Sequence, residues 1–463
     1  MISGRLLCVA IAIAIAVAEK AEGERVAQVH LSLTGDLTSM GLDYVSSLDS
    51  YSAIEYTAQD PSSSTWTAPG AAPGHSVTAS LARSTSIYYE NIGFLHTAVL
   101  DNLLPKTVYS YRIGDVNSDS WSDQWFHFTT GPYERSEFYR KGESIESVSG
   151  EGVAAVYADL GVYNGLSVNR LLHEANQSIF DYTLHIGDIS YDLFSDNSSV
   201  GNTYMNMMEP ITSKFPLMVG EGNHEKSDNF TEYNYRFKSI ENLAGKNSKS
   251  NSNHFYSFDV GLVHYVMVST EVYNYPTQAR DGPSPFTADE QLTWLEEDLV
   301  KANDPAQRKK VPWIVLMGHR PWYTTEFEVT SGTSFHDFDD LGCQYGVDLY
   351  ITGHVHNYQR YHPLRTGSSF IPKEVDTDCV SSDGHVYTDP KFMPTIVAGS
   401  TGCHSPLPRV ACPVMAVASD LFLKDALAHC SAAYGFGHLQ VTMHFCFDIY
   451  KNIFILVSCV TGC

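Results

Sequence analysis

Five short apolar runs, each ending in a polar side chain near a glycine, constrain the fold of this chain more than any other feature. They read VAAVYADLG, YTLHIGDISY, FPLMVGEGNHE, PWIVLMGHR and VDLYITGHVH. Runs this short and rich in β-branched residues indicate buried strands, and the amphipathic stretches between them indicate helices. The alternation predicts an α/β domain, in which a ligand site lies at the carboxyl ends of the strands.

The ends of these runs share a small set of residue types. They deliver Asp159, Asp188, Tyr191, Asn223, His224, His319, His354 and His356. A single aspartate after a strand usually caps a turn or a helix, and a single histidine there is usually only hydrogen-bonded. Five such endings in one chain are not explained in that way, so we expect the side chains to meet in one site. Glycines that would allow close approach of the backbone are Gly187, Gly222, Gly318 and Gly353.

Seven of these side chains are more than one metal ion needs, which predicts a pair of ions. The seven are Asp159, Asp188, Tyr191, Asn223, His319, His354 and His356. One carboxylate can bridge two ions, which lie about 3.5–4 Å apart in two-metal hydrolases. The absence of thiolates disfavours an iron–sulfur cluster. A tyrosine phenol, with an ordinary pKa of about 10, needs a strongly acidic ion such as Fe³⁺ to ionise at low pH.

Residues 151–445 carry these runs and form the predicted catalytic domain. Two stretches within it have helical periodicity, SVNRLLHEANQS and TADEQLTWLEEDLVKA. The second places Leu292, Leu295 and Leu299 on one face, with Thr287 or Asp289 as the N-cap.

The N-terminal part has a different pattern, which predicts a separate all-β domain over residues 26–132. Short alternating stretches lie between Gly, Pro, Ser and Asp turns, as in VAQVHLSL, SIYYENIGFLHTAVL, VYSYRIG and QWFHFTT. This pattern is typical of a small β-sandwich, and LDNLLPKTVYSYRIG followed by FHFTT resembles a fibronectin type III module. The polar residues 133–150 form the predicted linker. A chain of 463 residues is long enough for two domains.

Charge and the first residues indicate the compartment. A formal net charge of −24 excludes functions that depend on binding the phosphate backbone of nucleic acids, because these need clustered Lys and Arg. Arg5, the apolar residues that follow it and Ala16-Val17-Ala18 predict a signal peptide over residues 1–18. The alternative is a membrane anchor, but about 13 apolar residues are too few to span a bilayer about 30 Å thick. We therefore expect a secreted, extracellular or vacuolar–lysosomal protein without a stable membrane span.

In an exported protein, two covalent modifications are expected. Three sequons predict N-glycosylation, at Asn176, Asn197 and Asn229. Eight cysteines remain after removal of the signal peptide, and their even number fits disulfide bonds in an oxidising compartment. They are Cys343, Cys379, Cys403, Cys412, Cys430, Cys446, Cys459 and Cys463. None forms a CxxC pair, so a structural zinc site is not expected.

In their order, the five strand-end blocks closely resemble those of the metallophosphoesterase superfamily. The blocks read ADLG, GDISY, GNHE, VLMGH and GHVHNYQR. A tyrosine three residues after the second-block aspartate is similar to the purple acid phosphatases, in their long plant- and animal-like form with an N-terminal β module. HFYSFDVGLVHYVMVSTE and YGFGHLQV add to the resemblance, which covers roughly residues 26–442. It implies a catalytic domain that is an α/β/β/α sandwich.

Transferred residue by residue, the resemblance implies a binuclear centre. Fe(III) would be bound by Asp159, Tyr191 and His356. A divalent ion (Fe, Zn or Mn) would be bound by Asn223, His319 and His354, and Asp188 would bridge the two ions. His224 would lie just outside the ions, where it could hydrogen-bond the phosphate or protonate the leaving group.

The resemblance implies an acid phosphatase that hydrolyses phosphate monoesters by in-line attack of a metal-bound hydroxide. Because Fe(III) lowers the pKa of bound water, hydroxide would be present below neutral pH. Two alternatives remain open: a phosphodiesterase or nucleotide pyrophosphatase of the same superfamily, and a non-catalytic secreted glycoprotein that binds a partner. The intact ligand set argues against the second. The sequence predicts neither the natural substrate nor whether the protein is a monomer or a homodimer.

Three features depart from the family pattern. Ala158 stands in the first block where the family commonly has glycine, although the aspartate and Gly161 remain. Family members often have further substrate-facing histidines after the fourth block, and here the chain offers only His336 as a candidate. Residues 446–463 form a divergent tail that contains cysteines, and it is interpreted either as a divergent final strand with disulfides or as a wrongly predicted end of the gene.

Overall fold

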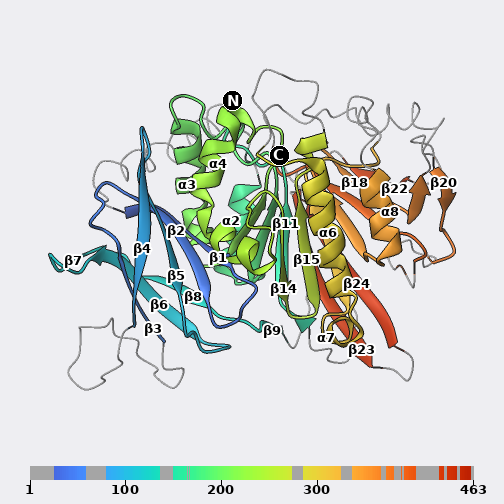
Figure 1. Ribbon diagram of the computed structural model, residues 1–463, viewed down its shortest axis with the longest axis horizontal. Coiled ribbons are helices and arrows are strands. Elements are labelled where there is room, and N and C mark those ends of the chain that lie inside the picture. The colour runs from blue at the N-terminus through green and yellow to red at the C-terminus, as the bar shows by residue number, and fades with distance from the viewer. Residues whose placement is uncertain are drawn as a thin grey trace, which may run out of the picture.

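The structure is a computed structural model of the chain. It describes residues 26–58, 80–135, 150–163, 165, 167–273, 285–324, 336–366, 372–379, 387, 390–402, 427–431, 435–445 and 449–459. The predicted signal peptide lies outside these residues. Figure 1 shows an N-terminal sheet domain beside a larger part in which helices and strands alternate.

The N-terminal domain has two layers that share one long strand. Its strands are β1 (Val26–Leu33), β2 (Met40–Ser46), β3 (Ala53–Ala58), β4 (Ser80–Tyr89), β5 (Gly93–Leu100), β6 (Val108–Asp115), β7 (Ser120–Trp121) and β8 (Phe126–Thr129). One end of β4 pairs with β5 in the layer of β1 and β2, and its other end pairs with β3 in the layer of β6. Leu42 and Leu100 from one layer share a buried core with Tyr111 and Phe128 from the other. This confirms the predicted β-sandwich, and VAQVHLSL corresponds to β1.

The larger part contains two extended sheets. One has the strand order β13 (Leu217–Gly220), β12 (Tyr182–Ile186), β11 (Val153–Tyr157), β23 (Gly435–Phe445) and β24 (Ile449–Cys459). The other has the order β14 (Tyr256–Val260), β15 (Val263–Val268), β16 (Trp313–Gly318), β17 (Leu349–Thr352), β21 (Thr395–Ala398), β18 (Tyr358–Tyr361) and β22 (Leu427–Ser431). The sheets pack face to face, since the hydroxyls of Tyr182 and Tyr265 lie 2.8 Å apart between them.

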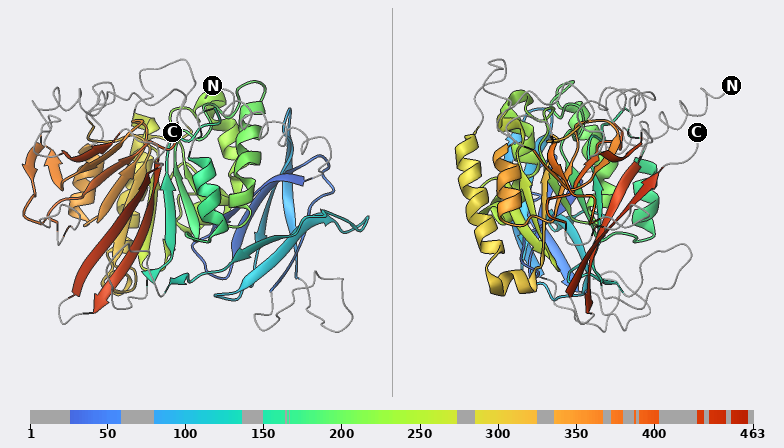
Figure 2. Two further views of the ribbon diagram at one scale, coloured as in Figure 1. Left: turned by 180° about the vertical axis from the view of Figure 1, so that it is seen from behind. Right: turned by 90° about the vertical axis from the view of Figure 1, so that its right-hand side faces the viewer.

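Helices cover both outer faces of this pair of sheets, as Figure 2 shows in its right-hand view. Two helices lie on the five-stranded sheet, α2 (Val168–Asn176) and α3 (Ser199–Thr212). On the seven-stranded sheet lie α6 (Ala288–Ala302) and α8 (His336–Gln344), and the short α7 (Pro305–Lys310), which has no buried residue, follows α6. Shorter helical segments are η1 (Ser227–Phe230), α4 (Thr231–Arg236), α5 (Lys238–Ile240), η2 (Glu241–Gly245) and η3 (Glu271–Tyr273). The layers confirm the predicted α/β/β/α sandwich.

All five apolar runs are confirmed as strands, namely β11, β12, β13, β16 and β17. Within each sheet these strands are parallel to one another. They are divided between the two sheets, however, and do not form a single open sheet. The carboxyl ends of both parallel groups meet at the same edge of the sandwich, which is how five separate strands supply one cluster of side chains.

The predicted helix over 287–302 is α6, and Thr287 is its N-cap. Thr287 Oγ1 accepts from the backbone N–H of Glu290, and the Glu290 carboxylate accepts from the backbone N–H of Thr287. This capping box satisfies two amides that the helix leaves without partners. Leu295 and Leu299 are buried against the seven-stranded sheet, while Leu292 is partly buried.

Buried polar contacts join the N-terminal domain to the larger part. The guanidinium of Arg236 donates to Gln28 Oε1 of β1 at 2.8 Å and to Glu232 at 2.9 Å. The backbone N–H of Val29 donates to Glu209 of α3 at 3.1 Å. Because these groups are buried, separation of the two domains would leave charged and polar atoms in need of new partners.

The linker and the tail each contribute residues to an antiparallel strand pair. In the predicted linker, β9 (Glu134–Arg135) pairs with β10 (Gly150–Glu151). The tail contains β24, which pairs with β23 along its whole length and extends the five-stranded sheet. A further ribbon joins β19 (Leu364–Thr366) to β20 (Pro372–Val375).

The prediction of disulfide bonds can be compared with the structure at two of the eight cysteines. Cys343 and Cys379 are free thiols, so the predicted disulfides do not include these two residues. The side chains of the other six cysteines lie outside the described residues.

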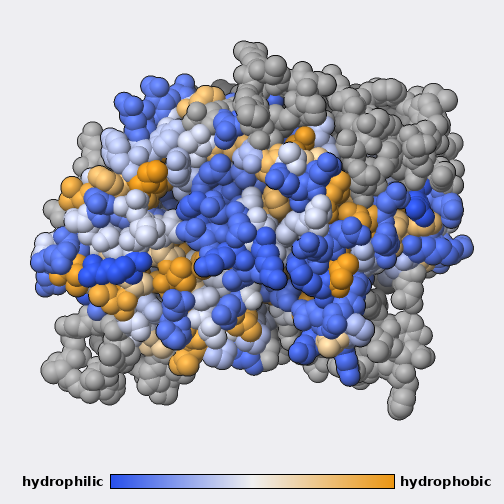
Figure 3. All heavy atoms as spheres, viewed as in Figure 1, coloured by the Kyte–Doolittle hydropathy of each residue, from blue (hydrophilic) through white to orange (hydrophobic). Residues whose placement is uncertain are grey.

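Across the described ranges, no helix has the length and apolar character needed to cross a membrane. The face shown in Figure 3 is mostly hydrophilic, with small scattered apolar patches.

Candidate metal centre

The side chains predicted to meet at the strand ends do meet. Two groups of possible metal ligands emerge, one of Asp159, Asp188 and His356 and the other of Asp188, His319 and His354. Within each group the ligand atoms all lie within 4.8 Å of one another. Asp188 belongs to both groups, so its carboxylate lies between two positions that a cation could occupy.

The first group includes Tyr191. Its hydroxyl donates to Asp159 Oδ1 at 3.1 Å and lies 2.9 Å from His356 Nε2. His356 Nε2 is itself 3.4 Å from Asp159 Oδ1. The three side chains that sequence analysis assigned to one ion therefore converge, although they come from strand ends of both sheets.

The second group includes Asn223. His319 Nε2 lies 3.2 Å from Asp188 Oδ1 and 3.3 Å from Asn223 Oδ1. The other ring nitrogen of His319, Nδ1, faces the backbone carbonyl of Ile186 at 3.0 Å. A proton held on Nδ1 by this carbonyl directs the lone pair of Nε2 toward the cluster, as second-shell partners of metal-binding histidines do.

The backbone is strained where it presents these side chains. Asp159, Asp188, Tyr191 and His354 have φ values of 57°, 49°, 55° and 66°, in the left-handed region that residues other than glycine seldom adopt. Such conformations cost about 1–3 kcal/mol each and persist only where the surrounding structure imposes them. Four of them within one cluster indicate a functional site.

Gly353 is required by crowding at the same place. A Cβ atom at this position would lie 2.6 Å from Asp159 Oδ2 and 2.5 Å from Ala158 Cβ. Both distances are too short for a real contact, so an alanine at 353 would displace the Asp159 carboxylate. The glycine therefore allows the fifth run to approach the first, as the sequence predicted.

Glu225 positions these strand ends, a role that was not evident from the sequence. Its buried carboxylate accepts three backbone N–H groups, those of Asp188 at 2.9 Å, Ile189 at 2.8 Å and Gly222 at 2.8 Å. Glu225 thereby ties the end of β12 to the end of β13. Burial and the neighbouring Asp188 raise the pKa of Glu225 to about 8, although the amide donors act in the opposite direction. The glutamate of the GNHE block was the available signal.

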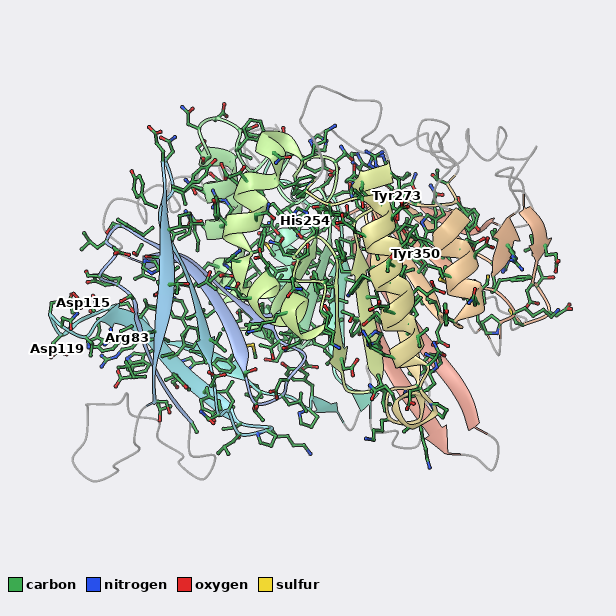
Figure 4. All side chains as sticks on the ribbon, viewed as in Figure 1. Arg83, Asp115, Asp119, His254, Tyr273 and Tyr350 are labelled. Carbon is green, nitrogen blue, oxygen red and sulfur yellow. The ribbon has the colours of Figure 1, made fainter. Side chains whose placement is uncertain are left out.

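Glu221 fixes the same loop from the other side. Its buried carboxylate is hydrogen-bonded to His254, labelled in Figure 4, and to the hydroxyl of Ser269. The loop that carries Asn223 and His224 is therefore held by two glutamates, one on each side of Gly222.

His224 has a partner that the sequence did not reveal. Its Nδ1 lies 2.6 Å from Asp192 Oδ1, and its Nε2 lies 3.9 Å from Asp188 Oδ2. The ring packs edge-on against Tyr191, with the two centroids 4.6 Å apart. Burial alone would lower the pKa of His224, but the hydrogen bond with Asp192 and the charge of Asp188 raise it. The imidazole can therefore carry a proton toward the cluster at acid pH.

The charged groups of the cluster shift the pKa values of its histidines in opposite directions. Burial alone would lower the pKa of His319, but the charge and hydrogen bond of Asp188 raise it to about 10. Burial alone would likewise raise the pKa of the Asp188 carboxyl, but His319 beside it holds that pKa well below its usual range. Burial, Arg320 and His319 lower the pKa of His354.

The residues present fit a pair of cations. Two carboxylates, three imidazoles, a phenol and a carboxamide are oxygen and nitrogen ligands suited to iron, zinc or manganese. The Asp188 carboxylate, which raises the pKa of the buried His319, also attracts a metal ion, which binds in place of the proton.

Arg320 is a further residue that sequence analysis did not single out. It follows His319, and its Nη1 lies 3.0 Å from His354 Nε2. Its guanidinium is paired with the carboxylate of Glu271, with Nε to Oε1 at 2.7 Å and Nη2 to Oε2 at 3.0 Å. An arginine thus lies at the edge of a cluster that contains two carboxylates.

The remaining predicted sites lie elsewhere. Asn176, Asn197 and Asn229 are all exposed, as a glycosylated asparagine has to be. The backbone of His336 begins α8, and its side chain lies outside the described residues. The structure therefore does not test the role suggested for His336.

Two family profiles match the chain in the order of its two domains. The profile of the purple acid phosphatase N-terminal domain matches residues 26–130. The profile of the calcineurin-like phosphoesterases matches residues 155–358, which include every residue of the cluster.

Relatives match along most of the chain. Acid phosphatase type 7 of Homo sapiens is 30% identical over 398 residues, which cover 82% of this chain and 78% of the human protein. The protein of the same name from Danio rerio is 31% identical, with coverages of 82% and 79%. Purple acid phosphatase 18 of Arabidopsis thaliana is 29% identical, with coverages of 74% and 68%.

One solved structure shares the fold over nearly the whole chain. The purple acid phosphatase PPD1 from yellow lupin (Lupinus luteus) seeds superposes with a TM-score of 0.63 at 19% sequence identity. The match covers 94% of this chain and 72% of the lupin chain. It therefore includes both the N-terminal sheet domain and the α/β/β/α sandwich.

Proposed function

Because the chain belongs to the purple acid phosphatases, hydrolases of the metallophosphoesterase superfamily, we propose that it hydrolyses phosphate monoesters at acid pH in the cluster at the strand ends. The observation that carries this proposal is the pair of ligand groups that share Asp188. Two cations on either side of one carboxylate suit the transfer of a phosphoryl group, whose charge develops on several oxygens at once.

The proposed ligands follow the geometry of the two groups. Fe(III) would be held by Asp159, Tyr191 and His356. A divalent ion (Fe, Zn or Mn) would be held by Asn223, His319 and His354, with Asp188 between the two ions. When bound, such a pair supplies Lewis-acid chemistry, which activates water below neutral pH and neutralises the phosphate oxygens.

The chain's own residues contribute proton transfer and alignment. His224, protonated on Nε2, donates to the oxygen of the leaving alcohol, and Asp192 accepts from Nδ1 and holds the ring in that orientation. Glu225 keeps Asp188 and the loop of Asn223 in register through the backbone. Each of these roles orients a group before reaction, so that little reorganisation is needed in the transition state.

The first experiment measures turnover of p-nitrophenyl phosphate and of bis(p-nitrophenyl) phosphate by the purified full-length protein, from pH 4 to pH 8, together with its metal content. The proposal expects turnover of the monoester with an acid optimum and much slower turnover of the diester. Preferential cleavage of the diester would instead make the protein a phosphodiesterase. Turnover of neither ester by protein loaded with two metal ions would contradict an enzymatic function.

The visible spectrum tests the assignment of Fe(III). Tyrosinate bound to Fe(III) gives a violet charge-transfer band, which Tyr191→Phe is expected to abolish. A colourless protein that contains only zinc would contradict the iron assignment, whereas phosphatase activity would stay compatible with the cluster.

We further propose that the protein acts outside the cytosol, either secreted or in a vacuolar or lysosomal compartment. The signal-peptide pattern of residues 1–18 and the exposure of all three sequon asparagines support this location. A shift in electrophoretic mobility after endoglycosidase treatment of protein from a eukaryotic host tests it.

A further inference from the structure

Arg320 is held rigidly at the edge of the metal centre. Its backbone N–H donates to Thr270 Oγ1 at 2.9 Å, and its carbonyl accepts from the hydroxyl of Tyr350 at 2.7 Å. Tyr350, labelled in Figure 4, stacks on Trp322 with a centroid separation of 3.9 Å. The backbone N–H and C=O of Arg320 are thus both hydrogen-bonded to buried side chains, which fixes the position from which the Arg320 side chain extends.

The guanidinium is fixed as well. Glu271 binds it in a bidentate manner through Nε and Nη2, and the Glu271 side chain is only 2% exposed. A bidentate pair fixes the plane of the guanidinium in a way that a single charge–charge contact does not. The pair leaves Nη1 at the edge that faces the cluster, 3.0 Å from His354 Nε2.

The contact between Arg320 and His354 has a chemical consequence. A ring nitrogen that is bound to a cation has no lone pair left to accept a hydrogen bond. When His354 binds an ion through Nε2, this contact is lost, and Nη1 of Arg320 lies where it can donate to an oxygen atom at the same edge. The guanidinium itself cannot retreat far, because Glu271 holds its other two nitrogens.

We propose that Arg320 is a phosphate-binding residue whose Nη1 edge donates to a non-bridging oxygen of the substrate phosphate, and that Glu271 is its positioning residue. The inference rests on the proposed function, since it names a substrate contact at the same site. A planar guanidinium suits this role, because phosphate oxygens accept paired N–H donors and the charge persists at every pH of interest. Arg320 thereby supplies a fixed cation beside the fourth strand end.

Phosphate binding is the sharpest test, because it does not depend on turnover. Affinity for inorganic phosphate is measured by isothermal titration calorimetry on metal-loaded protein, and KM and kcat are measured with p-nitrophenyl phosphate. Arg320→Met is expected to weaken phosphate binding and to raise KM about 10-fold or more, as the loss of a charge-assisted hydrogen bond implies. Metal content is expected to stay at the wild-type level. Guanidinium ion added at millimolar concentrations is expected to restore part of the affinity.

A second variant distinguishes phosphate contact by Arg320 from the positioning of Arg320 by Glu271, and a third serves as the control. Glu271→Gln keeps the guanidinium but loosens its orientation, so we expect a smaller loss of phosphate affinity than in Arg320→Met. Arg308→Met is the matched control: Arg308 is paired with Asp348 at 2.9 Å, and its side chain is 20% exposed compared with 15% for Arg320. Arg308 lies at the end of the strands opposite the cluster, and its replacement is expected to leave phosphate affinity unchanged.

The outcomes distinguish this inference from the proposed function. Unchanged phosphate affinity and KM in Arg320→Met would overturn the inference while wild-type turnover upholds the phosphatase. Loss of metal from Arg320→Met in proportion to its loss of phosphate binding would also overturn it, because the arginine would then support only His354. A wild-type protein that binds phosphate through Arg320 but hydrolyses no ester would uphold the contact and contradict the proposed function.

Discussion

Asp192 determines what His224 can do, because the 2.6 Å contact with Nδ1 leaves Nε2 as the nitrogen that faces the cluster. A histidine that protonates a leaving group matters most when that group is a poor one. We therefore expect His224→Ala to lower kcat about 100-fold or more for β-glycerophosphate and much less for p-nitrophenyl phosphate. Steady-state kinetics with both substrates checks this, with metal content measured for each variant.

Asp192→Asn tests the orientation separately. The carboxamide keeps the size of the side chain but removes the charge, so we expect a loss of about 10-fold in kcat with the same dependence on leaving group. Equal losses for both substrates in both variants would contradict proton transfer by His224 and would indicate a role in binding alone.

Replacement of Glu225 is expected to disturb a larger part of the site than replacement of the other residues. Its carboxylate accepts three buried backbone N–H groups, and a glutamine presents an NH₂ group in place of one oxygen. Each buried amide left without an acceptor costs about 1–3 kcal/mol. We expect Glu225→Gln to lower the free energy of unfolding by about that amount and to reduce metal content. Glu297→Gln on the exposed face of α6 is the control, for which both quantities should stay unchanged.

Among the elements, α6 is attached to the seven-stranded sheet by a buried histidine. His264 of β15 lies 2.7 Å from Asp259 Oδ1 through Nδ1 and 2.8 Å from Asp298 Oδ2 of α6 through Nε2. Burial alone would lower the pKa of His264, but the hydrogen bonds with Asp259 and Asp298 raise it to about 9. Two carboxylates that flank one imidazole favour its doubly protonated form, since each then accepts an N–H.

This histidine makes stability depend on pH in a defined window. A folded-state pKa raised from 6.5 to about 9 gives a stabilisation that is complete below pH 6.5 and is lost as the pH rises to about 9. At about 1.4 kcal/mol per pKa unit, the loss amounts to about 3 kcal/mol. Urea unfolding at pH 6 and at pH 9.5 measures it. In His264→Gln this difference should shrink by the same amount, and a wild-type difference retained in full would show that other groups cause it.

The directions of the strands explain the position of the cluster. Parallel strands have the same direction, so the polar residues after β11, β12 and β13 reach one edge of their sheet, as those after β16 and β17 do in theirs. Face-to-face packing of the two sheets then brings both edges together. The positive φ values of Asp159, Asp188 and His354 turn the chain sharply at this edge and aim the side chains inward.

At the scale of the whole molecule, Arg236 links the two domains. It is buried and donates to Glu232, to Asn202 and to Gln28 of the N-terminal domain. Removing one partner of a buried ion pair costs about 3–5 kcal/mol, because the other charge stays buried. We expect Arg236→Met to lower the thermal midpoint in scanning calorimetry markedly. Arg83→Met is the control, since Arg83 is exposed on the N-terminal domain (Figure 4) and its removal should have little effect.

Sequence alone predicted the elements that depend on short-range pattern. Period-two alternation predicted the β-sandwich, and the apolar runs predicted the five strands, because burial selects β-branched and apolar residues locally. The N-cap of α6 is likewise local: the sequence offered Thr287 or Asp289, and the structure selects Thr287, with Glu290 completing a capping box three positions later. The ligand types at the strand ends could also be read directly, and the structure brings them together.

What only the tertiary structure decided depends on contacts between distant parts of the chain. The division of the five strands between two sheets cannot be read from the runs, because a buried strand has the same composition in either sheet. Asp192 and His224 are 32 residues apart, Asp188 and Glu225 are 37, and Glu271 and Arg320 are 49. No periodicity links residues at such separations. Their pairing results from packing, which places each carboxylate next to donors that offset its lost hydration.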